Sequence, residues 1–303
     1  MKQLTKQRLI GPALCMAPMG VYLCLSFALV FGLLIIGLCV NGGDGETFLN
    51  EMLEHPLVGI ADQCCMLAGG LLGVLFVRMR NKTKFKKVLT FRNFDWSVPI
   101  MLLIFGWAAG ELVDHFGGLI LSNFMTVPPN ERDLSGITGF ISACILAPLA
   151  EELLFRYCGT EYLRGAYPAW LISLAGGLVF AAVHFYNIQG FVNVCIGGVT
   201  AAYVYCKTRN LWYTIIEHAL HNALCLLPIY DAVYYEKNGF VLSQWWWLLI
   251  NAVLLTISIV WYFRHFRRKY TGNPFAVNKE TGLPEPEIAK PVKAAPASVP
   301  YQY

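Results

Sequence analysis

The chain has 303 residues, of which 56% are hydrophobic and only 14% are Asp, Glu, Lys or Arg. Soluble domains carry about 25% charged residues, so this composition excludes an ordinary soluble protein. The charges are also unevenly distributed, because none lies between Arg8 and Asp44 or between Lys237 and Arg264. A membrane-spanning helix needs about 20 mainly apolar residues, and each gap can hold one. The sequence therefore predicts a polytopic membrane protein.

Hydrophobic segments follow one another along the chain and predict an all-α fold of about eight transmembrane helices in one bundle. The segments lie at roughly 12–40, 57–77, 97–121, 136–155, 167–186, 190–206, 211–230 and 241–263. We expect this transmembrane domain to cover residues 1–269. Residues 270–303 are rich in Pro, Ala and Lys and have no apolar period. That composition predicts a disordered cytoplasmic tail.

The basic residues between these segments lie mostly on one side of the predicted membrane. If the loops alternate between the two faces, most of the 23 Lys and Arg residues lie on the face that holds both termini. The positive-inside rule then predicts a multi-pass protein of the cell (cytoplasmic) membrane with both termini in the cytoplasm. The basic run at 78–87 directly follows a hydrophobic segment. We therefore assign it to topology and contact with the lipid bilayer, and predict no nucleic-acid partner.

Charged side chains inside hydrophobic segments are costly in a membrane and are usually functional. The fourth segment ends with Glu151, Glu152 and Arg156. On a helix, Glu152 and Arg156 are four residues apart and can form an ion pair, whereas Glu151 points about 100° away from its neighbour. We therefore expect Arg156 to hold Glu152 and to leave Glu151 facing a cavity. The alternative is a salt-bridge cluster at the end of the helix.

Histidine and asparagine side chains enter from two later helices. His184 lies near the end of the fifth segment, and His218 and Asn222 lie one turn apart on the seventh. By residue counting, Glu151 lies towards the cytoplasmic end of its helix, whereas His184 lies towards the exterior end of its own. The two can meet if the fifth helix is short or tilted, or if a re-entrant stretch follows it near 186–190.

Three motifs occur in order on successive hydrophobic helices: Glu-Glu-x-x-x-Arg at 151–156, Phe-x-x-x-His at 180–184 and His-x-x-x-Asn at 218–222. They resemble the motifs of the CAAX prenyl endopeptidase and bacteriocin-processing family, also called CPBP or Abi, whose members are intramembrane proteases. The resemblance covers about 136–230. It implies an intramembrane endopeptidase that acts on a membrane-associated protein or peptide. One departure is Tyr157, where many members have glycine.

The chemistry of these side chains favours hydrolysis by an activated water molecule. No Ser or Cys is placed with a His in a recognisable nucleophile arrangement. Glu151 is the candidate general base, with His184 orienting the water. His218 and Asn222 are expected to stabilise the oxyanion on the scissile carbonyl. The second glutamate and the arginine of the first motif are supporting residues. The family resemblance implies the same scheme.

A divalent metal such as zinc is the alternative to this scheme, although we favour a site without a cofactor. Two histidines and a carboxylate can form a catalytic zinc site, and the candidate ligands here are His184, His218 and Glu151. The His-Glu-x-x-His helix of soluble metalloproteases is absent from the sequence. In addition, the amide of Asn222 is a poor zinc ligand.

Two other functional classes remain open on the sequence alone. The same carboxylates and histidines can form the relay of a proton-coupled transporter. A catalytically silent immunity or scaffold protein can also keep the fold without turnover. Asp62, Glu111, Asp114 and His115 lie in hydrophobic segments outside the motifs, where they either line a substrate cavity or form ordinary polarity near helix ends. Glu217 precedes a motif histidine and is assigned no role.

Overall fold

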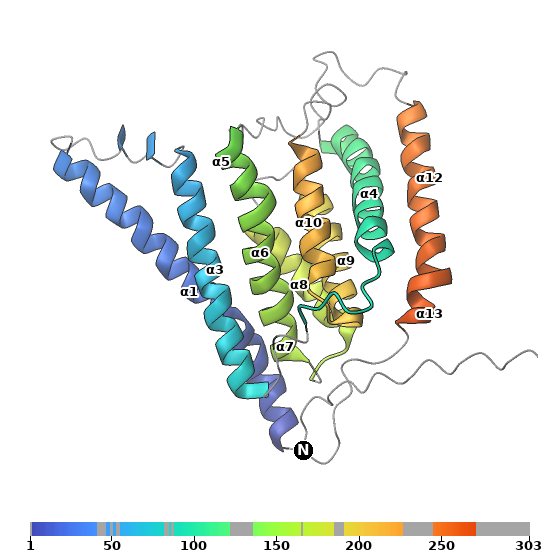
Figure 1. The fold of residues 1–303 in the computed structure, drawn as a ribbon, viewed down its shortest axis with the longest axis horizontal. Helices are drawn as coiled ribbons and strands as arrows, with labels where there is room; N and C mark the ends of the chain where they lie inside the picture. The colour runs from blue at the N-terminus through green and yellow to red at the C-terminus, as the bar shows by residue number, and fades with distance from the viewer. Residues whose placement is uncertain are drawn as a thin grey trace, which may run out of the picture.

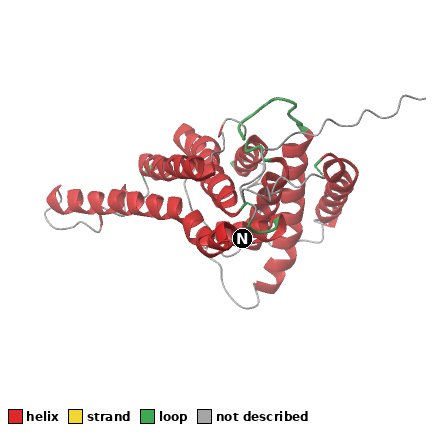
Figure 2. Ribbon diagram, turned by 90° about the horizontal axis from the view of Figure 1, so that it is seen from below, coloured by secondary structure: helices red, strands yellow, loops and turns green. Residues whose placement is uncertain are grey.

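The computed structural model describes residues 2–40, 47–48, 51–52, 55–81, 85, 88–121, 136–164, 166–184, 191–226 and 245–270. Within these ranges the regular elements are helices, and no strand is formed (Figure 2). Apart from Tyr270, the predicted tail at 270–303 lies outside the described residues.

Each predicted segment contains a helix, and the helices follow in the predicted order. The first three are α1 (Lys2–Val40), α3 (Pro56–Asn81) and α4 (Ser97–Leu121). A continuous helical run follows, made of α5 (Gly136–Phe140), η2 (Ile141–Leu146), α6 (Ala147–Glu151), η3 (Glu152–Cys158) and α7 (Gly159–Leu163), in which η2 and η3 are π-helical. The remaining elements are α8 (Ala169–Val183), α9 (Phe191–Thr208), α10 (Trp212–Cys225), α12 (Trp245–Trp261), the π-helical η5 (Tyr262–Phe266) and α13 (Arg267–Lys269).

Four stretches of helix are long and apolar enough to cross a membrane. They are Arg8–Val40, Leu57–Met79, Gly136–Leu163 and Trp245–Lys269. Two shorter apolar helices cover Ser97–Val113 and Ala169–Val183. The prediction of an all-helical, multi-pass membrane protein is therefore confirmed, whereas the count of eight spans stays a prediction.

The helix ends differ from the predicted ones around the motifs. The fourth helix continues to Leu163 instead of ending near 155, because no proline interrupts it before Pro168. The fifth helix begins directly after Pro168, whose backbone is extended, and ends at Val183. It is therefore shorter than the predicted 167–186.

The motif-bearing helices lie together in the middle of the molecule. At one edge α1 packs against α3, and at the opposite edge α12 packs against α4 (Figure 1). Between these pairs, α10 contacts η2 and α6 on one side and α4 on the other. Behind α10 in this view, α8 and α9 pack against each other. The helices that carry the paired glutamates, His184 and His218 are thus brought into one group.

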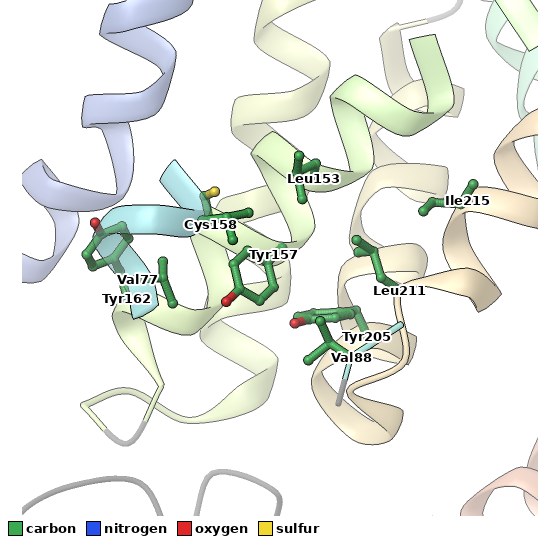
Figure 3. Close-up of a cluster of buried hydrophobic side chains, with 10 residues drawn as sticks. Val77, Val88, Leu153, Tyr157, Cys158, Tyr162, Tyr205, Leu211 and Ile215 are labelled. Atoms are coloured by element: carbon green, nitrogen blue, oxygen red, sulfur yellow. The ribbon is translucent and has the colours of Figure 1, made fainter. Parts of the chain in front are cut away.

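A buried cluster fixes the helix of the paired glutamates against the helix of His218. Leu153 and Tyr157 of η3 pack with Leu211 and Ile215 at the start of α10. The cluster is completed by Cys158 at the end of η3 and by side chains from α3, α7, α9 and the connection before α4 (Figure 3), namely Val74, Val77, Val88, Tyr162 and Tyr205. Because Ile215 lies within one turn of His218, this core sets the level at which α10 meets η3.

Two glycines allow α8 and α9 to cross closely. A Cβ atom on Gly177 would lie 2.8 Å from the Cα atom of Val199, and one on Gly198 would lie 3.1 Å from the Cα atom of Gly177. A side chain at either position would therefore push the helices apart. Phe180 follows Gly177 by one turn, and its ring lies against Gly198. This crossing positions the part of α8 that leads into His184.

Candidate active site

Pro148 shapes the backbone just before the paired glutamates. The N–H group of Ala147 donates to the carbonyl oxygen of Ser142, five residues back, which is the π-helical pattern. The next acceptor in that pattern is the carbonyl of Ala143, but Pro148 has no N–H group to donate to it. Instead, the side-chain amide of Asn222 on α10 donates to this carbonyl, with Nδ2 and the oxygen 2.7 Å apart. The proline thus leaves an acceptor through which α10 is tied to η2.

Glu152 is buried between a guanidinium and an imidazole. Its Oε2 atom lies 3.1 Å from Nε of Arg156, so the ion pair predicted from their spacing is present. Its Oε1 atom lies 3.1 Å from Nδ1 of His218. Only 1% of the Glu152 surface is exposed, and an isolated carboxylate is very costly at such a site. The second partner, His218, comes from a helix that sequence spacing does not relate to Glu152.

Glu151 lies where the two motif histidines meet. Its Oε2 atom is 3.7 Å from Nε2 of His184 and 3.9 Å from Nε2 of His218. Both separations are too long for a direct hydrogen bond. Within the described part of the chain, this oxygen has no hydrogen-bond partner although it is buried. The ends of α6 and α8 and the middle of α10 therefore place three titratable groups around one small space.

The hydrogen bonds on the far side of each imidazole determine how it faces Glu151. Nδ1 of His184 lies 2.8 Å from the carbonyl oxygen of Phe180, which can only accept, so we assign the hydrogen to Nδ1. Nδ1 of His218 likewise donates to the Glu152 carboxylate. In the neutral form of each ring, Nε2 then presents a lone pair towards Oε2 of Glu151. Three acceptors converge, an arrangement that a hydrogen donor such as water satisfies.

These hydrogen bonds also distinguish the two predicted oxyanion donors. A neutral His218 with its hydrogen on Nδ1 has no N–H at Nε2, so it donates from that atom only as an imidazolium. Asn222 has two amide hydrogens and gives one to Ala143. The second hydrogen of Asn222 is available in every protonation state of the site.

Phe180 is the shared neighbour of the charged and imidazole groups. The guanidinium carbon of Arg156 lies 4.3 Å from the centre of the Phe180 ring. The same ring centre is 4.4 Å from that of His184 and 6.1 Å from that of His218. A cation over an aromatic face is attracted to it. Phe180 therefore packs the supporting arginine and both histidines against one rigid surface.

The short fifth helix removes the mismatch in height between Glu151 and His184. The 15 residues of α8 rise about 22 Å at 1.5 Å per residue. The hydrocarbon core of a bilayer is about 30 Å thick, so α8 is shorter than this core, and its end brings His184 close to Glu151. Residues 185–190, which include the suggested re-entrant stretch, lie outside the described part.

Polar residues outside the motifs join neighbouring helices. The indole N–H of Trp247 on α12 donates to Glu111 on α4, with Nε1 and Oε2 2.9 Å apart. The hydroxyl groups of Tyr22 and Ser26 on α1 donate to Asp62 on α3. Each of these carboxylates thus has a partner on an adjacent helix. The sequence also placed Asp114 and His115 in hydrophobic segments outside the motifs. The side chain of Asp114 lies outside the described part, and His115 packs edge-on against Phe116.

The described side chains do not form a ready metal site. In the ranges that the structure covers, no group of three or more His, Cys, Asp or Glu residues is arranged to hold a metal ion. His184 and His218 each lie more than 3.6 Å from the Glu151 oxygen, and both use Nδ1 for hydrogen bonds within the protein. The metal-free scheme stays a prediction, which metal analysis tests directly.

One part of the sequence matches a known protein family. Residues 133–224 match the family described as Type II CAAX prenyl endopeptidase Rce1-like. The matched stretch contains all three motifs and the whole Glu151, His184 and His218 arrangement. No curated protein and no solved structure matches the chain.

Proposed function

We propose that the protein is an intramembrane endopeptidase, a function supported by the match of residues 133–224 to the family described as Type II CAAX prenyl endopeptidase Rce1-like. Its substrate is a membrane-associated protein or peptide, and its reaction is hydrolysis of a peptide bond. The observation that carries the proposal is the position of the Glu151 carboxylate between Nε2 of His184 and Nε2 of His218. The protein acts in the cytoplasmic membrane with both termini in the cytoplasm.

Glu151 serves as the general base. A water molecule held at this point donates one hydrogen to Oε2 of Glu151 and the other to Nε2 of His184. Glu151 accepts the first proton as the water oxygen attacks the scissile carbonyl carbon. His184 accepts the second hydrogen bond and thereby aims the oxygen lone pair. The fixed tautomer of His184 supports this role, because its Nε2 is an acceptor while Nδ1 is bound to Phe180.

Asn222 and His218 stabilise the oxyanion that forms on the carbonyl. Asn222 supplies its second amide hydrogen, and Ala143 holds the amide in place. His218 contributes as an imidazolium, whose positive charge is compensated by the Glu152 carboxylate on Nδ1. The proton taken up by Glu151 then passes to the leaving amine, which breaks the peptide bond and restores the carboxylate. No metal ion is needed in these steps.

The decisive test is cleavage of a fluorogenic membrane peptide by purified wild type and by Glu151→Gln. General acid–base catalysis contributes about 10²–10⁴-fold, so we expect kcat to fall by a factor in this range. Glu51→Gln removes an exposed carboxylate remote from the motifs and serves as the matched control with unchanged kcat. Full cleavage by Glu151→Gln contradicts the assignment of the general base.

Two further measurements separate the competing classes. Ion flux in liposomes that is lost in Glu151→Gln, without cleavage of any peptide by wild type, supports a transporter instead. Stoichiometric zinc in the purified protein that is lost in His184→Ala overturns the metal-free scheme. The zinc measurement does not depend on knowing the natural substrate.

A further inference from the structure

We propose that Glu217 and Trp107 form a subsite that binds a basic side chain, Lys or Arg, of the substrate peptide. This specificity site rests on the proposed peptidase function, because it lies directly beside the proposed reaction centre. Glu217 and His218 are consecutive residues of α10, and consecutive residues on a helix point about 100° apart. His218 faces Glu152, whereas Glu217 faces α4.

The position of Glu217 is defined by a glycine on the neighbouring helix. A Cβ atom on Gly106 of α4 would lie 3.9 Å from Oε1 of Glu217, so the carboxylate reaches across to the backbone of α4. Trp107 is the next residue on α4, and the centre of its ring lies 6.0 Å from that of His221. His221 follows Glu217 by one turn of α10. The carboxylate and the indole therefore belong to the same α4–α10 contact, and both residues are half-buried.

Glu217 lacks the direct partner that Glu152 and Glu111 have. Glu152 is paired with Arg156, and Glu111 accepts from an indole. Within the described part of the chain, Glu217 has neither an ion pair nor a hydrogen bond. A half-buried carboxylate without a partner is costly in an apolar environment. Such a cost is offset when the partner is supplied by a ligand.

Among the described residues, no Lys or Arg is paired directly with Glu217, although the charges of His218 and Arg156 act on it from a greater distance. Neither α4 nor α10 contains a Lys or an Arg. Arg156 is paired with Glu152 and lies over the ring of Phe180. We therefore assign the direct cation partner of Glu217 to a bound molecule, and the molecule that the proposed reaction brings to this place is the substrate peptide.

The surroundings of Glu217 suit the shape of a basic side chain. The mainly apolar side chains of α4 suit an aliphatic stem, the carboxylate pairs with the charged end, and an indole attracts a cation to its face. Glu217 lies five residues into α10, about 8 Å along the helix from its start at Trp212. A Lys or Arg side chain that enters from the level of Trp212 can span much of this distance. Its charged end then meets the Glu217 carboxylate, and its aliphatic stem lies among apolar side chains.

The test measures binding, so that it does not depend on turnover. Lipid-anchored fluorescent peptides that differ only by Lys or Gln at one position, scanned along the peptide, are titrated against Glu151→Gln in nanodiscs by anisotropy. At one position we expect the Lys peptide to bind at least about tenfold more tightly than the Gln peptide, as for a partly desolvated charge pair. Adding Glu217→Gln removes this preference, and adding Glu217→Lys transfers it to a peptide with Glu at that position.

Glu111→Gln, added in the same background, is the matched control. This variant removes an intramembrane carboxylate on α4 that already has a partner within the protein. We expect the preference for Lys to remain. Equal affinities for the Lys and Gln peptides at every position, or a Lys preference that survives Glu217→Gln, overturn the proposal. A Lys preference in a protein that cleaves no peptide contradicts the peptidase function and leaves the cation subsite standing.

Discussion

Oε1 of Glu152 lies 3.1 Å from Nδ1 of His218, across a sequence separation of 66 residues. The same carboxylate holds Arg156 through its other oxygen. Glu152 thus links the guanidinium of its own helix to an imidazole of α10, whose other nitrogen faces Glu151. A supporting residue of the first motif thereby becomes the residue that sets the orientation of a proposed catalytic histidine.

Glu152→Gln is expected to lower both stability and cleavage. The change leaves Arg156 buried without its counter-charge, and breaking a buried pair from one side costs about 3–5 kcal/mol of unfolding free energy. Loss of the group that orients His218 is expected to lower cleavage about 10–100-fold, the range known for residues that orient metal-bound histidines. Thermal unfolding in detergent and kcat measured on the folded fraction test the two effects separately.

The double variant Glu152→Gln/Arg156→Gln is the control for charge. It removes both members of the ion pair, so we expect it to recover part of the lost stability without recovering cleavage. ¹⁵N spectroscopy of labelled histidine reports which ring nitrogen of His218 carries the hydrogen. An unchanged tautomer mixture in Glu152→Leu, which leaves no acceptor at this position, shows that Glu152 does not set it.

Asn222→Ala is expected to remove a structural bond and an oxyanion donor together. The partly buried carbonyl of Ala143 loses its side-chain donor, which costs at most the roughly 1–3 kcal/mol of a fully buried polar group. Loss of one oxyanion donor lowers kcat by about 10²–10³-fold. A variant that loses stability but keeps kcat assigns Asn222 to the tie between α10 and η2 alone.

Pro148→Ala tests why this tie exists. Alanine supplies the N–H group that proline lacks, five residues after Ala143, so the carbonyl gains an alternative donor. We expect Asn222→Ala to cost less unfolding free energy in the Pro148→Ala background than in wild type. Equal costs in the two backgrounds, measured by a double-mutant cycle, contradict the link between proline and asparagine.

Gly177→Ala is expected to disturb the crossing of α8 and α9. The added methyl group meets the backbone of Val199, and such overpacking costs about 1–3 kcal/mol. Because α8 leads into His184, cleavage falls as well. Gly197→Ala is the matched control, since a Cβ there has nothing within 4 Å. Thermal unfolding of the two variants should therefore differ clearly, and equal unfolding midpoints contradict the predicted clash.

Asp95 lies in the connection before α4, outside the membrane-spanning segments. Its Oδ2 atom is 2.6 Å from Nζ of Lys269 and 2.8 Å from Nε2 of His265, and Ser97 donates to its other oxygen. Its backbone N–H donates to the hydroxyl group of Tyr213. Partial burial by itself raises the pKa of Asp95, but the hydrogen bonds outweigh it and hold this pKa well below its usual range. The loop is thereby tied to α10 and α13.

This lowered pKa predicts a loss of stability in acid. The unfolded chain binds a proton at the ordinary Asp pKa of about 3.9, whereas the folded chain binds it only at lower pH. The stabilisation by Asp95 is therefore present above about pH 4 and is lost as the pH falls through the folded-state pKa. We expect the difference in unfolding midpoint between wild type and Asp95→Asn to be constant near pH 6 and to shrink below about pH 4. A difference that persists unchanged near pH 3 contradicts the assignment.

Much of the membrane domain follows from the order of residues alone. The gaps between charges located the helices, because an apolar stretch of about 20 residues needs no distant partner to be favourable in a bilayer. The pairing of Glu152 with Arg156 also followed from sequence, since residues four apart on a helix are neighbours. The three motifs identified the polar residues of interest before any contact between them was known.

Contacts between helices were decided by the tertiary structure. Helical spacing relates Glu152 to Arg156, but it cannot relate it to His218, which reaches it because Leu153, Tyr157, Leu211 and Ile215 pack η3 against α10. The meeting of Glu151 with His184 depends on a fifth helix that starts late and on a close glycine crossing. Sequence periodicity determines which face of a helix is polar. Packing between helices determines what that face meets, and here it places the Glu151 carboxylate between two imidazoles.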